Sequence, residues 1–507
     1  MFSSYLLPLG ILLLSVLSLG HSIDTAAAVD FSLSRRASNI RQELGPKLSK
    51  DAVIIDAESG DMAAATKRWQ VFASPSFSAV VEVATENDIV ETIAYANAHS
   101  IPFLAVNAGH GEIKSLANMK DGIQITIRAL NKITINEDNT ATVQGGATNL
   151  EITQELWAAK KQTVSGTCEC VGFLGPMLGG GHGWIQGLHG LAADQIIKAR
   201  VILANGTIVS ASTTENPDLF WALRGAGHNF GIVSEVTNKI YDVPDSDEWY
   251  FEKYTYTGAS VDQLFDQLEK IKRDTPPELQ FYSVFLNIPA IDSTQALVFM
   301  AMLYNGPASA ADKWMAPFRT FNPIDIEKGS TTYPELSALT GNGINDDICQ
   351  HEPINRIRYP LYLDGMKKGV PKQVYNLYNA TTAQYPALNR SLMLFEGLST
   401  QAVRSVQLDT TAVALRKFHT LASPVVTYAP DAALDQVAQD FGRELRNILH
   451  RAEGTPEMYA YVNYAVGEED IESIYGYRGW RVAKLKTLKK HLDPENRFRF
   501  YAPIVSS

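Results

Sequence analysis

The sequence predicts an α+β fold in two parts, with a glycine-rich first part and a second part built on an antiparallel sheet covered by helices. Two observations lead to this expectation. Before residue 240, short strands and helices alternate, and glycine loops recur where they end. After Pro244, longer strand-like segments are separated by amphipathic helices. We therefore expect these units: a leader at 1–22, a first domain at 23–244, a second domain at 245–455, and a C-terminal segment at 456–507 that returns to the first domain.

Composition and charge fit a folded protein and narrow its range of partners. The 507 residues exceed one ordinary domain, and 45% hydrophobic with 20% charged residues can bury a substantial core. The formal net charge is −11, and Lys and Arg are scattered rather than gathered in a stripe. Nucleic acid is therefore not an expected partner, because binding to a phosphate backbone needs a concentrated basic surface.

The N-terminus reads as a secretory leader. Residues 6–19 form an apolar run that is too short to cross a bilayer and is followed by small and polar residues, although the usual basic residues before it are missing. Cleavage is expected near Ser22 or within 26–28, and an N-terminal membrane anchor is the alternative. Sequons for N-glycosylation at Asn205, Asn379 and Asn389 fit this route. No later stretch has about 18 consecutive apolar residues, so we expect no membrane segment in the mature protein.

The first domain is predicted to hold a β-α-β unit followed by antiparallel strands. Thr85 and Asp88 read as a capping box that opens a helix ending near residue 100. Residues 102–106 are fully apolar, which predicts a buried strand leading into the loop 107–111. Further strands are expected at 52–60, 72–83, 122–127, 133–135, 140–143, 196–203 and 208–212, and helices at 23–51, 149–160 and 216–224. The strands at 122–127, 133–135 and 140–143 should pair with one another. The strands at 196–203 and 208–212 should form a hairpin about an Asn-Gly turn.

The second domain and the C-terminal segment show longer elements. Loops within 321–353 contain prolines and are expected to reach over a site. Residues 458–466 are aromatic and predict β structure, and 471–491 predict one helix. The remaining expectations are strands at 250–256, 281–288 and 296–304, and helices at 261–273, 309–316 and 431–451.

The stretch 165–230 is unusually rich in glycine. Glycine at so many positions indicates a backbone that takes positive φ or lies directly against a bound group, and a cofactor is the simplest reason. His110 sits between two glycines after a predicted strand, and Cys168 lies in one of the glycine loops. Alone, each could be an ordinary turn histidine or a buried thiol.

Metal binding is not expected. The Cys-x-Cys spacing of Cys168 and Cys170 is too tight for a zinc knuckle. Three further histidines near glycines lack the i, i+4 pairing of a helical zinc site, and no acidic ligand motif accompanies them; these are His182, His189 and His228. With Cys349 the chain has three cysteines, an odd number for a secreted protein, so one sulfur is left over unless something other than cysteine takes it.

Together these motifs resemble the flavin-dependent oxidoreductases of the vanillyl-alcohol oxidase type, in the berberine-bridge-enzyme-like branch. The similarity covers about 75–243 and returns at 458–504. Asn-Ala-Gly-His at 107–110 is similar to the family's Arg-Gly-Gly-His loop, and Gly-Thr-Cys at 166–168 to its Gly-x-Cys-Pro loop. Other similar segments follow in family order, at 179–183, 190–194, 219–233, 461–464 and 493–498.

The resemblance implies FAD, held against glycine loops that offer backbone N–H groups to its pyrophosphate. In the family the loop histidine is joined to the flavin 8α methyl and the cysteine to its 6 position. The resemblance therefore implies that His110 and Cys168 are the residues joined to the flavin here. That would leave Cys170 and Cys349 as a possible disulfide, although Cys170 could itself compete for the flavin. The full set of implied cofactor-binding residues is His110, Cys168, Asn107, Gly109, Gly111, Gly145, Val171, Gly172, Gly179, Gly180, Gly181, Gly183, Asp194, Gly227, Asn229, Gly231, Ile232, Val233 and Asn496.

The resemblance also implies a catalytic base. Tyr464 is the candidate: a phenol whose pKa is lowered by neighbouring positive charge could take a substrate proton while hydride passes to flavin N5. Asn463 would orient the flavin or the substrate. A tyrosine packed on the flavin with no proton role is the alternative. Val171 stands where the family gates oxygen and is small, which favours an oxidase that uses O2 and releases H2O2.

We therefore expect a secreted FAD oxidase of an alcohol, a sugar or a secondary metabolite. A nicotinamide dehydrogenase does not fit, because no Gly-x-Gly-x-x-Gly follows a first strand with an acidic residue about 20 positions on. A flavin-fold dehydrogenase with another acceptor and a non-catalytic secreted glycoprotein are the alternatives. The second domain should line the substrate side, but its aromatics are expected to be mostly core; these are Tyr282, Phe285, Tyr304, Tyr359, Tyr362 and Phe395.

Overall fold

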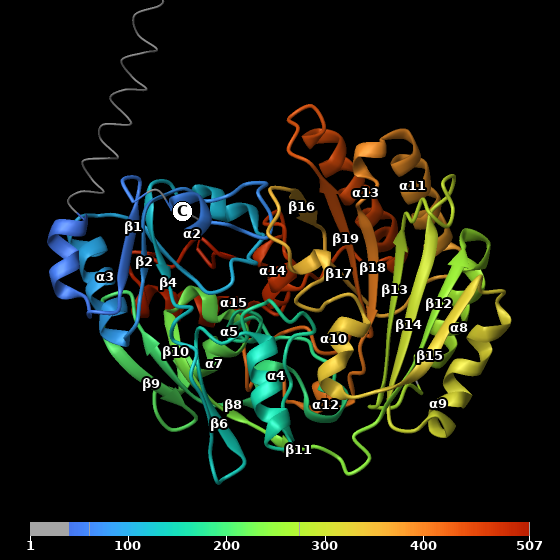
Figure 1. Ribbon diagram of the computed structural model, residues 1–507, viewed down its shortest axis with the longest axis horizontal. Helices are drawn as coiled ribbons and strands as arrows, with labels where there is room; N and C mark the ends of the chain where they lie inside the picture. The colour runs from blue at the N-terminus through green and yellow to red at the C-terminus, as the bar shows by residue number, and fades with distance from the viewer. Residues whose placement is uncertain (1–39, 60, 273, 506–507) are drawn as a thin grey trace, which may run out of the picture.

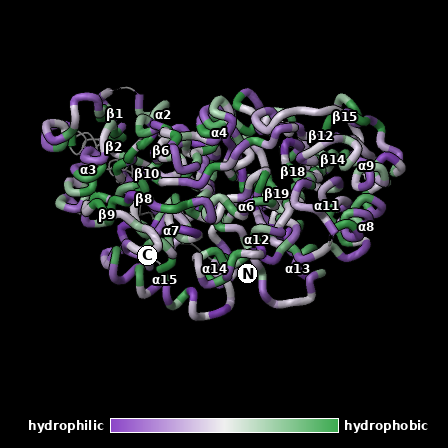
Figure 2. The backbone as a smooth tube through the Cα atoms, turned by 90° about the horizontal axis from the view of Figure 1, so that it is seen from below, coloured by the Kyte–Doolittle hydropathy of each residue, from purple (hydrophilic) through white to green (hydrophobic). Residues whose placement is uncertain are grey.

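In the computed structural model, which describes residues 40–505 except 60 and 273, the chain forms two parts that lie side by side (Figure 1). The first part, drawn in blue to green, contains two main sheets, and the second contains one large sheet. The C-terminal segment, in red, returns to the first part. The view from below shows the same arrangement, with α3 at one end of the molecule and α9 at the other (Figure 2). The predicted leader lies outside the described residues.

The first sheet contains the predicted β-α-β unit. Its strands lie in the order β1 (Val53–Asp56), β2 (Phe77–Glu82), β4 (Gly122–Thr126) and β3 (Phe103–Val106). β1 is antiparallel to β2, and the other pairs are parallel. Helix α3 (Glu86–Ala98) begins at the predicted capping box, in which the backbone N–H of Thr85 donates to the Asp88 carboxylate at 2.8 Å. β3 is less buried than predicted, because residues 104–106 line a cavity.

A second sheet of five antiparallel strands follows. Its order is β5 (Ile133–Ile135), β6 (Thr140–Gln144), β10 (Ile232–Lys239), β8 (Ile196–Ile202) and β9 (Ile208–Ser212). The predicted hairpin of β8 and β9 is confirmed. The predicted pairing of 122–127 with the next two strands is wrong, because β4 joins the parallel sheet. Apolar alternation shows which faces of a strand are buried, but it does not identify the partner strand.

The second part is one sheet of eight antiparallel strands, which confirms the expected class. Its order is β15 (Asp325–Thr331), β12 (Trp249–Thr257), β14 (Leu297–Asn305), β13 (Leu279–Leu286), β18 (Leu392–Gly397), β19 (Thr420–Tyr428) and β16 (Asn355–Arg358), with β17 (Leu361–Leu363) paired to β19. One face packs against α8 (Val261–Ile271), α11 (Val370–Gln384) and α13 (Asp435–Glu453) in a core that includes Phe285 and Phe395. The other face is turned toward the first part.

The C-terminal segment differs from prediction in two places. Residues 458–466 form a loop with the 3-10 turn η10 (Val462–Tyr464) instead of a strand. The helix predicted at 471–491 is divided into α14 (Ile471–Tyr475) and α15 (Gly479–Leu492), because Gly476 between them has a φ of 88°. The buried ammonium of Lys489 in α15 donates to the carbonyl oxygens of Asn229 and Phe498, which fixes the segment to the first part.

Short elements complete the fold. The helices are α2 (Met62–Ala65), α4 (Asn149–Ala158), α5 (Leu174–Leu178), α6 (Gln186–His189), α7 (Pro217–Ala226), α9 (Ala308–Met315), α10 (Leu336–Leu339) and α12 (Gln401–Ser405). The 3-10 turns are η1 (Gly45–Lys47), η2 (Lys114–Asn118), η3 (Ala192–Gln195), η4 (Gly227–Asn229), η5 (Gly258–Ser260), η6 (Ala316–Thr320), η7 (Tyr333–Glu335), η8 (Asp347–Cys349) and η9 (Pro386–Leu388), and β7 (Lys161–Gln162) pairs with β11 (Tyr241–Asp242). Within the described residues, no helix is both long and apolar enough to span a membrane.

Candidate functional site

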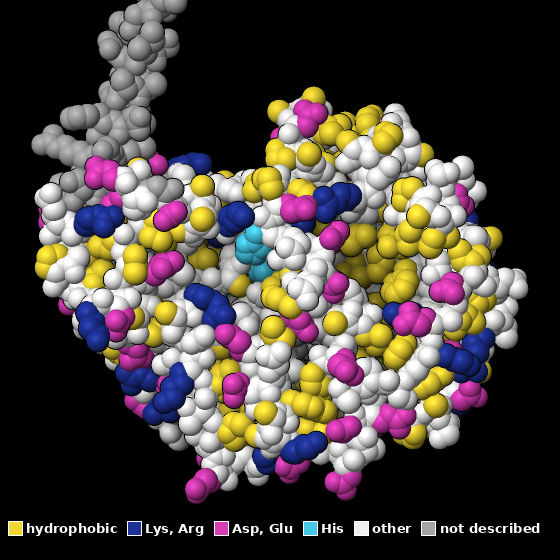
Figure 3. Space-filling model, in the orientation of Figure 1, with side chains coloured by type: hydrophobic (Ala, Val, Ile, Leu, Met, Phe, Trp, Pro, Cys, Tyr) yellow, Lys and Arg dark blue, Asp and Glu magenta, His cyan; other side chains and the backbone are white. Residues whose placement is uncertain are grey.

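A cavity of about 950 Å³ lies between the two parts. One wall comes from β3 and the loops of the first part, and the other comes from the open face of the large sheet. Figure 3 shows the surface hollowed between the two parts, with histidine side chains at the margin and hydrophobic side chains in the recess. A cavity of this size with a few convergent polar groups is typical of a cofactor or small-molecule site.

The loop 107–111 leaves β3 at the edge of this cavity. The side-chain amide of Asn107 donates to the carbonyl oxygens of Gly145 and Ala147, each at 3.0 Å, which fixes the loop to the end of β6. Gly109 has a φ of 73°, and a side chain would be strained there. This turn directs the chain so that His110 also lines the cavity.

Most of the predicted site residues are brought together here, although they come from segments far apart in the sequence. The predicted residues that line the cavity are Asn107, Gly109, His110, Gly111, Gly145, Cys168, Val171, Gly172, Gly231, Ile232, Val233, Asn463 and Tyr464.

The other predicted residues do not line the cavity: Gly179, Gly180, Gly181, Gly183, Asp194, Gly227, Asn229 and Asn496. Several of them have protein partners instead. A Cβ at Gly227 would lie 2.7 Å from Leu178 Cδ2, and Asp194 accepts two hydrogen bonds from Arg416 at 2.7 and 2.8 Å. Asn229 is bonded to backbone near the C-terminus. Sequence alone does not distinguish a glycine close to a ligand from one close to protein.

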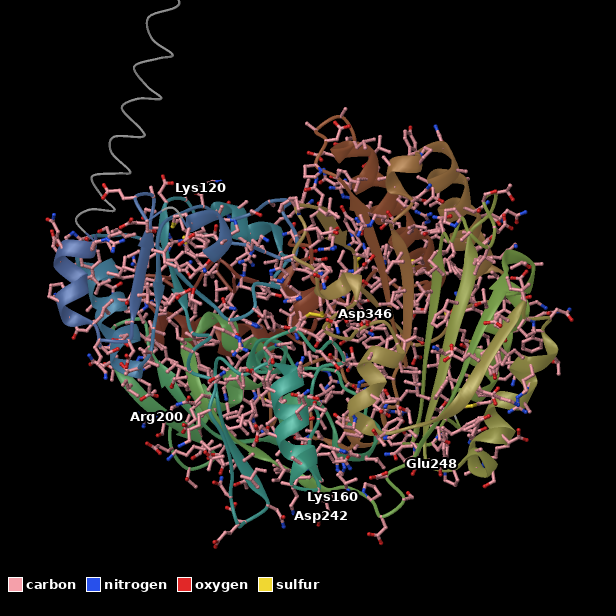
Figure 4. The ribbon with its side chains drawn as sticks, in the orientation of Figure 1. Lys120, Lys160, Arg200, Asp242, Glu248 and Asp346 are labelled. Atoms are coloured by element: carbon pink, nitrogen blue, oxygen red, sulfur yellow. A yellow bond between two sulfur atoms is a disulfide. The ribbon has the colours of Figure 1, made fainter. Side chains whose placement is uncertain are left out.

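Three sulfur atoms lie together beside the cavity, and of the three cysteines only Cys168 lines it. Cys170 forms a disulfide with Cys349, which joins the glycine loop of the first part to the second part, close to Asp346 in Figure 4. Cys168 is free, with its Sγ 3.5 Å from Cys170 Sγ and 3.7 Å from Cys349 Sγ. The disulfide confirms the hypothesis that these two cysteines pair, and it leaves Cys168 as the free thiol for a ligand. Burial raises the pKa of Cys168 to about 12.

His110 lies against the same cluster. Its Nε2 is 3.5 Å from Cys170 Sγ, and its Nδ1 is buried without a hydrogen-bond partner. The rings of Trp69 and His351 lie 6.1 and 5.2 Å away, centroid to centroid. Burial, with a smaller effect from His351, lowers the pKa of His110 to about 3. The imidazole is therefore neutral at physiological pH, and one ring nitrogen is available as a nucleophile.

The wall from the second part follows the two-residue period of its strands. Alternate residues of β13 and β18 face the cavity, so Tyr282 and its cross-strand neighbour Glu396 both line it. The residues between them, such as Phe285 and Phe395, pack under the helices. The expectation that the aromatics of this part are mostly core is thus confirmed.

Tyr464 and Glu396 meet at this wall. The Tyr464 hydroxyl donates to Glu396 Oε1 at 3.4 Å, and the guanidinium of Arg358 lies over the Tyr464 ring, 3.9 Å from its centroid. Burial and the Glu396 carboxyl raise the pKa of Tyr464 well above its ordinary value, with Arg358 opposing them. The predicted lowering of this pKa is therefore wrong: the positive charge is present, but it is outweighed. Burial raises the pKa of Glu396 to about 7, so Glu396 exchanges its proton near neutral pH.

Asn463 connects the C-terminal loop to the glycine-rich segment. Its amide donates to Pro176 O and to the Tyr461 hydroxyl, both at 2.7 Å. Tyr461 also accepts from the backbone N–H of His182 at 3.3 Å. The His182 ring bonds to Gln186 and Tyr362 at 2.8 and 2.7 Å, so both of its nitrogens have protein partners. We infer that Asn463 positions this wall.

Sequence reasoning does not identify the charged residues of the cavity wall: Arg68, Glu112, Asp347, Arg356, Arg358, Arg390 and Glu396. For some of them, the spacing within a strand is a sequence pattern that could have identified them. Glu396 follows two leucines of β18 in steps of two, and Arg356 and Arg358 alternate in the same way in β16. A charge at a buried-face position of a strand points to a site. Arg68 carries no comparable pattern.

The residues of the cavity fit the FAD that the resemblance implies. Asn107 Oδ1 and His110 Nδ1 are buried polar atoms without partners, and such atoms usually have one in a complete structure. Gly175 lies in the wall with open space where a Cβ would be, as a cradle for a large ligand requires. Apolar residues of β3 and aromatic ones near the C-terminus supply surface for a flat ring system.

Comparison with known proteins extends the similarity to about nine-tenths of the chain. The family model described as an FAD binding domain matches residues 77–212. The FAD-linked oxidoreductase chyH of Penicillium rubens is 39% identical over 469 residues, covering 92% of this chain and 93% of that protein. The FAD-linked oxidoreductase chry5 of Gibberella zeae is 37% identical over 479 residues, covering 91% and 94%.

Solved structures show the same fold at lower identity. The BBE-like 1 protein of Physcomitrella patens aligns with a TM-score of 0.79 at 20% identity, over 92% of this chain and 100% of that one. The glucooligosaccharide oxidase of Acremonium strictum, studied for its 6-S-cysteinyl, 8α-N1-histidyl FAD, aligns with the same score, identity and coverage. The chain therefore belongs to the FAD-linked oxidoreductases and is an FAD-binding enzyme, and it shares its fold with the BBE-like 1 protein.

Proposed function

We propose that this protein is a secreted oxidase that converts an alcohol carbon of a small substrate to a carbonyl, with O2 as the final acceptor and H2O2 as the product. Bound FAD supplies the hydride acceptor at flavin N5. The pair of Tyr464 and Glu396 carries the proposal. Oxidation of an alcohol releases a proton as well as a hydride, and this pair provides a proton acceptor in the cavity wall.

The proton moves from the substrate hydroxyl to Tyr464 as Tyr464 gives its own proton to Glu396. Glu396, with a pKa of about 7, is partly ionised at neutral pH and can receive it. Tyr464 then never has to exist as a free phenolate, which its raised pKa would disfavour. Arg358 over the ring stabilises negative charge that develops on the phenol oxygen.

We propose that FAD is joined to the chain through His110, with a second link through Cys168. A neutral imidazole with an unpartnered nitrogen and the free thiol both lie in the cavity wall. The glucooligosaccharide oxidase noted above carries histidyl and cysteinyl links, which supports the assignment by analogy. Two links would retain the cofactor outside the cell.

The choice of O2 rests on the small side chain of Val171, which lines the cavity, and on structural neighbours that are named oxidases. A flavin dehydrogenase with another acceptor is the second candidate.

For the substrate, the wall from the second part is largely apolar, with Val284, Leu392 and Leu394 in it. This lining favours an apolar secondary metabolite over a sugar.

Secretion and domain roles are part of the proposal. Asn205 is exposed at the turn between β8 and β9, so it is the most accessible of the three sequons. The side-chain Oδ1 of Asn379 accepts a hydrogen bond from the backbone N–H of Ala296 within the second part, and Asn389 borders the cavity. We assign cofactor binding to 23–244, substrate binding to 245–455, and closure of the site to 456–507.

The first test is acid precipitation of the purified protein, with flavin spectra taken on pellet and supernatant. A yellow pellet supports covalent FAD, and a yellow supernatant contradicts the covalent links. Protein without flavin in either fraction supports the non-catalytic alternative. Reaction of the photoreduced enzyme with O2, followed in a stopped-flow instrument, then decides the acceptor. Slow reoxidation without H2O2 contradicts the oxidase and favours the dehydrogenase.

A further inference from the structure

Two arginines of the cavity wall are buried without an acidic partner. Arg68 and Arg356 are 6% and 5% exposed. Among residues 40–505, apart from the two gaps, neither forms an ion pair with an Asp or Glu. The other arginines of the wall do: Arg358 lies 3.2 Å from Glu112, and Arg390 lies 3.0 Å from Glu352.

Arg68 is the more unusual of the two, because two of its buried donor atoms have no hydrogen-bond partner. Its Nη2 donates to Gly111 O at 2.8 Å, but Nε and Nη1 are buried with no hydrogen-bond partner. Burial lowers its pKa to about 10, so it is still a cation at neutral pH. A buried cation with free donors is unfavourable unless a ligand satisfies it. Because Arg68 lines the cavity, that ligand can come from the cavity.

Arg356 belongs to the same group through Trp69. It donates to Trp69 O, and its guanidinium carbon lies 4.8 Å from the centre of the Trp69 ring. Trp69 in turn stacks on His110. The nearby carboxyl of Glu112 is already the partner of Arg358, 3.2 Å away, and burial raises its pKa to about 7.

We propose that Arg68 and Arg356 bind an anionic oxygen group, a carboxylate or a phosphate, in the part of the cavity next to His110. The planar guanidinium groups present paired donors that match either anion. This anionic group belongs either to an acidic substrate or to the pyrophosphate of FAD. The inference rests on the proposed function, because that function makes the substrate and FAD the two ligands of the cavity.

The test uses the flavin-loaded protein and needs no turnover. Benzoate is the probe for the substrate source, with its Kd measured by calorimetry and by the flavin difference spectrum. Flavin bound per chain is the readout for the cofactor source. The variants are Arg68→Gln and Arg356→Gln, with Arg68→Lys as the conservative change. Arg390→Gln is the matched control, because Arg390 borders the same cavity but is half-exposed and paired with Glu352.

For an acidic substrate, benzoate binds the parent, and its Kd rises about 10-fold to 100-fold in both glutamine variants, because each loses a charged hydrogen bond. Arg68→Lys recovers part of the affinity for benzoate, and Arg390→Gln binds benzoate with the same Kd as the parent. For the cofactor source, flavin content falls in both glutamine variants and not in Arg390→Gln. Unchanged flavin content together with absent or unchanged benzoate binding overturns the proposal.

Thermal unfolding separates these results from misfolding. Removal of an unpaired buried charge should not lower the Tm of the apoprotein, whereas loss of a structural contact should. A lower Tm in both glutamine variants, with benzoate affinity and flavin content of the folded protein unchanged, also overturns the proposal. Failure of the oxidase proposal would appear separately, as an enzyme that binds flavin and benzoate but produces no H2O2.

Discussion

Glu396 Oε1 lies 3.4 Å from the Tyr464 hydroxyl, while Glu396 Oε2 is buried without a partner. The carboxyl comes from β18 of the second part, and the phenol comes from the C-terminal segment that packs on the first part. The pair therefore exists only when the segment has closed against both. This arrangement makes the proton acceptor a property of the assembled molecule, and it sets the expected pH dependence.

Glu396→Gln should remove the proton acceptor. We expect kcat to fall about 10²-fold to 10⁴-fold, the usual contribution of general base catalysis. In the parent, kcat should rise with pH through about 7, because Glu396 must be ionised to accept a proton and its pKa lies there. Steady-state rates across this range, in both proteins, check the prediction.

Glu252→Gln is the matched control for that experiment. Glu252 is also a fully buried glutamate of the same sheet, but it pairs with Arg319 away from the cavity. Its loss should lower stability and leave the pH profile in place. An ascending limb that survives in Glu396→Gln would contradict the assigned role.

The two flavin links should be separable by mass. Cys168→Ala should keep one covalent FAD through His110, because Cys170 is held in the disulfide and cannot replace Cys168. His110→Ala should lose the histidyl link. Peptide mapping after digestion identifies the attached residue. Flavin attached to Cys170 in either variant would contradict this prediction.

Loss of the disulfide should destabilise the protein. The double variant Cys170→Ser with Cys349→Ser should lower the free energy of unfolding by about 2–5 kcal/mol, because the bridge joins residues 179 apart in sequence and restricts the unfolded chain. Denaturant unfolding measures this change. Cys168→Ser is the control when both variants are measured without flavin, since Cys168 takes part in no disulfide. Equal stability of the two variants would show that the bridge does not form in solution.

Local sequence patterns predicted much of the fold because they are read from neighbouring residues. The capping box at Thr85, the hairpin of β8 and β9, and the sheet of the second part follow from side chains within a few positions of one another. The partner of β4 did not follow, because pairing is settled by distant strands. The division at Gly476 was missed because an isolated glycine inside a helical pattern is often tolerated.

The candidate site shows the same limit. The loops with His110 and Cys168 were found because motifs mark them, and the structure brings both into one wall. Glu396 and Arg358 were not found, since each lies in an ordinary strand and gains its meaning only from Tyr464, which is far away in the sequence. The pKa of Tyr464 depends on which of these charges is nearer and on burial, and neither is visible in a sequence.

The close packing of the glycine loops gives a last prediction. A Cβ at Gly145 would lie 2.6 Å from the carbonyl oxygen of Val233, a backbone atom that cannot move aside alone. Gly145→Ala should therefore cost about 1–3 kcal/mol of stability and reduce bound flavin, because the cavity wall must shift. Gly479→Ala is the control: a Cβ there meets nothing within 4 Å, and at the start of α15 alanine should be neutral or slightly stabilising. If both variants unfold at the parent's temperature with full flavin content, the wall at Gly145 is looser than the structure describes.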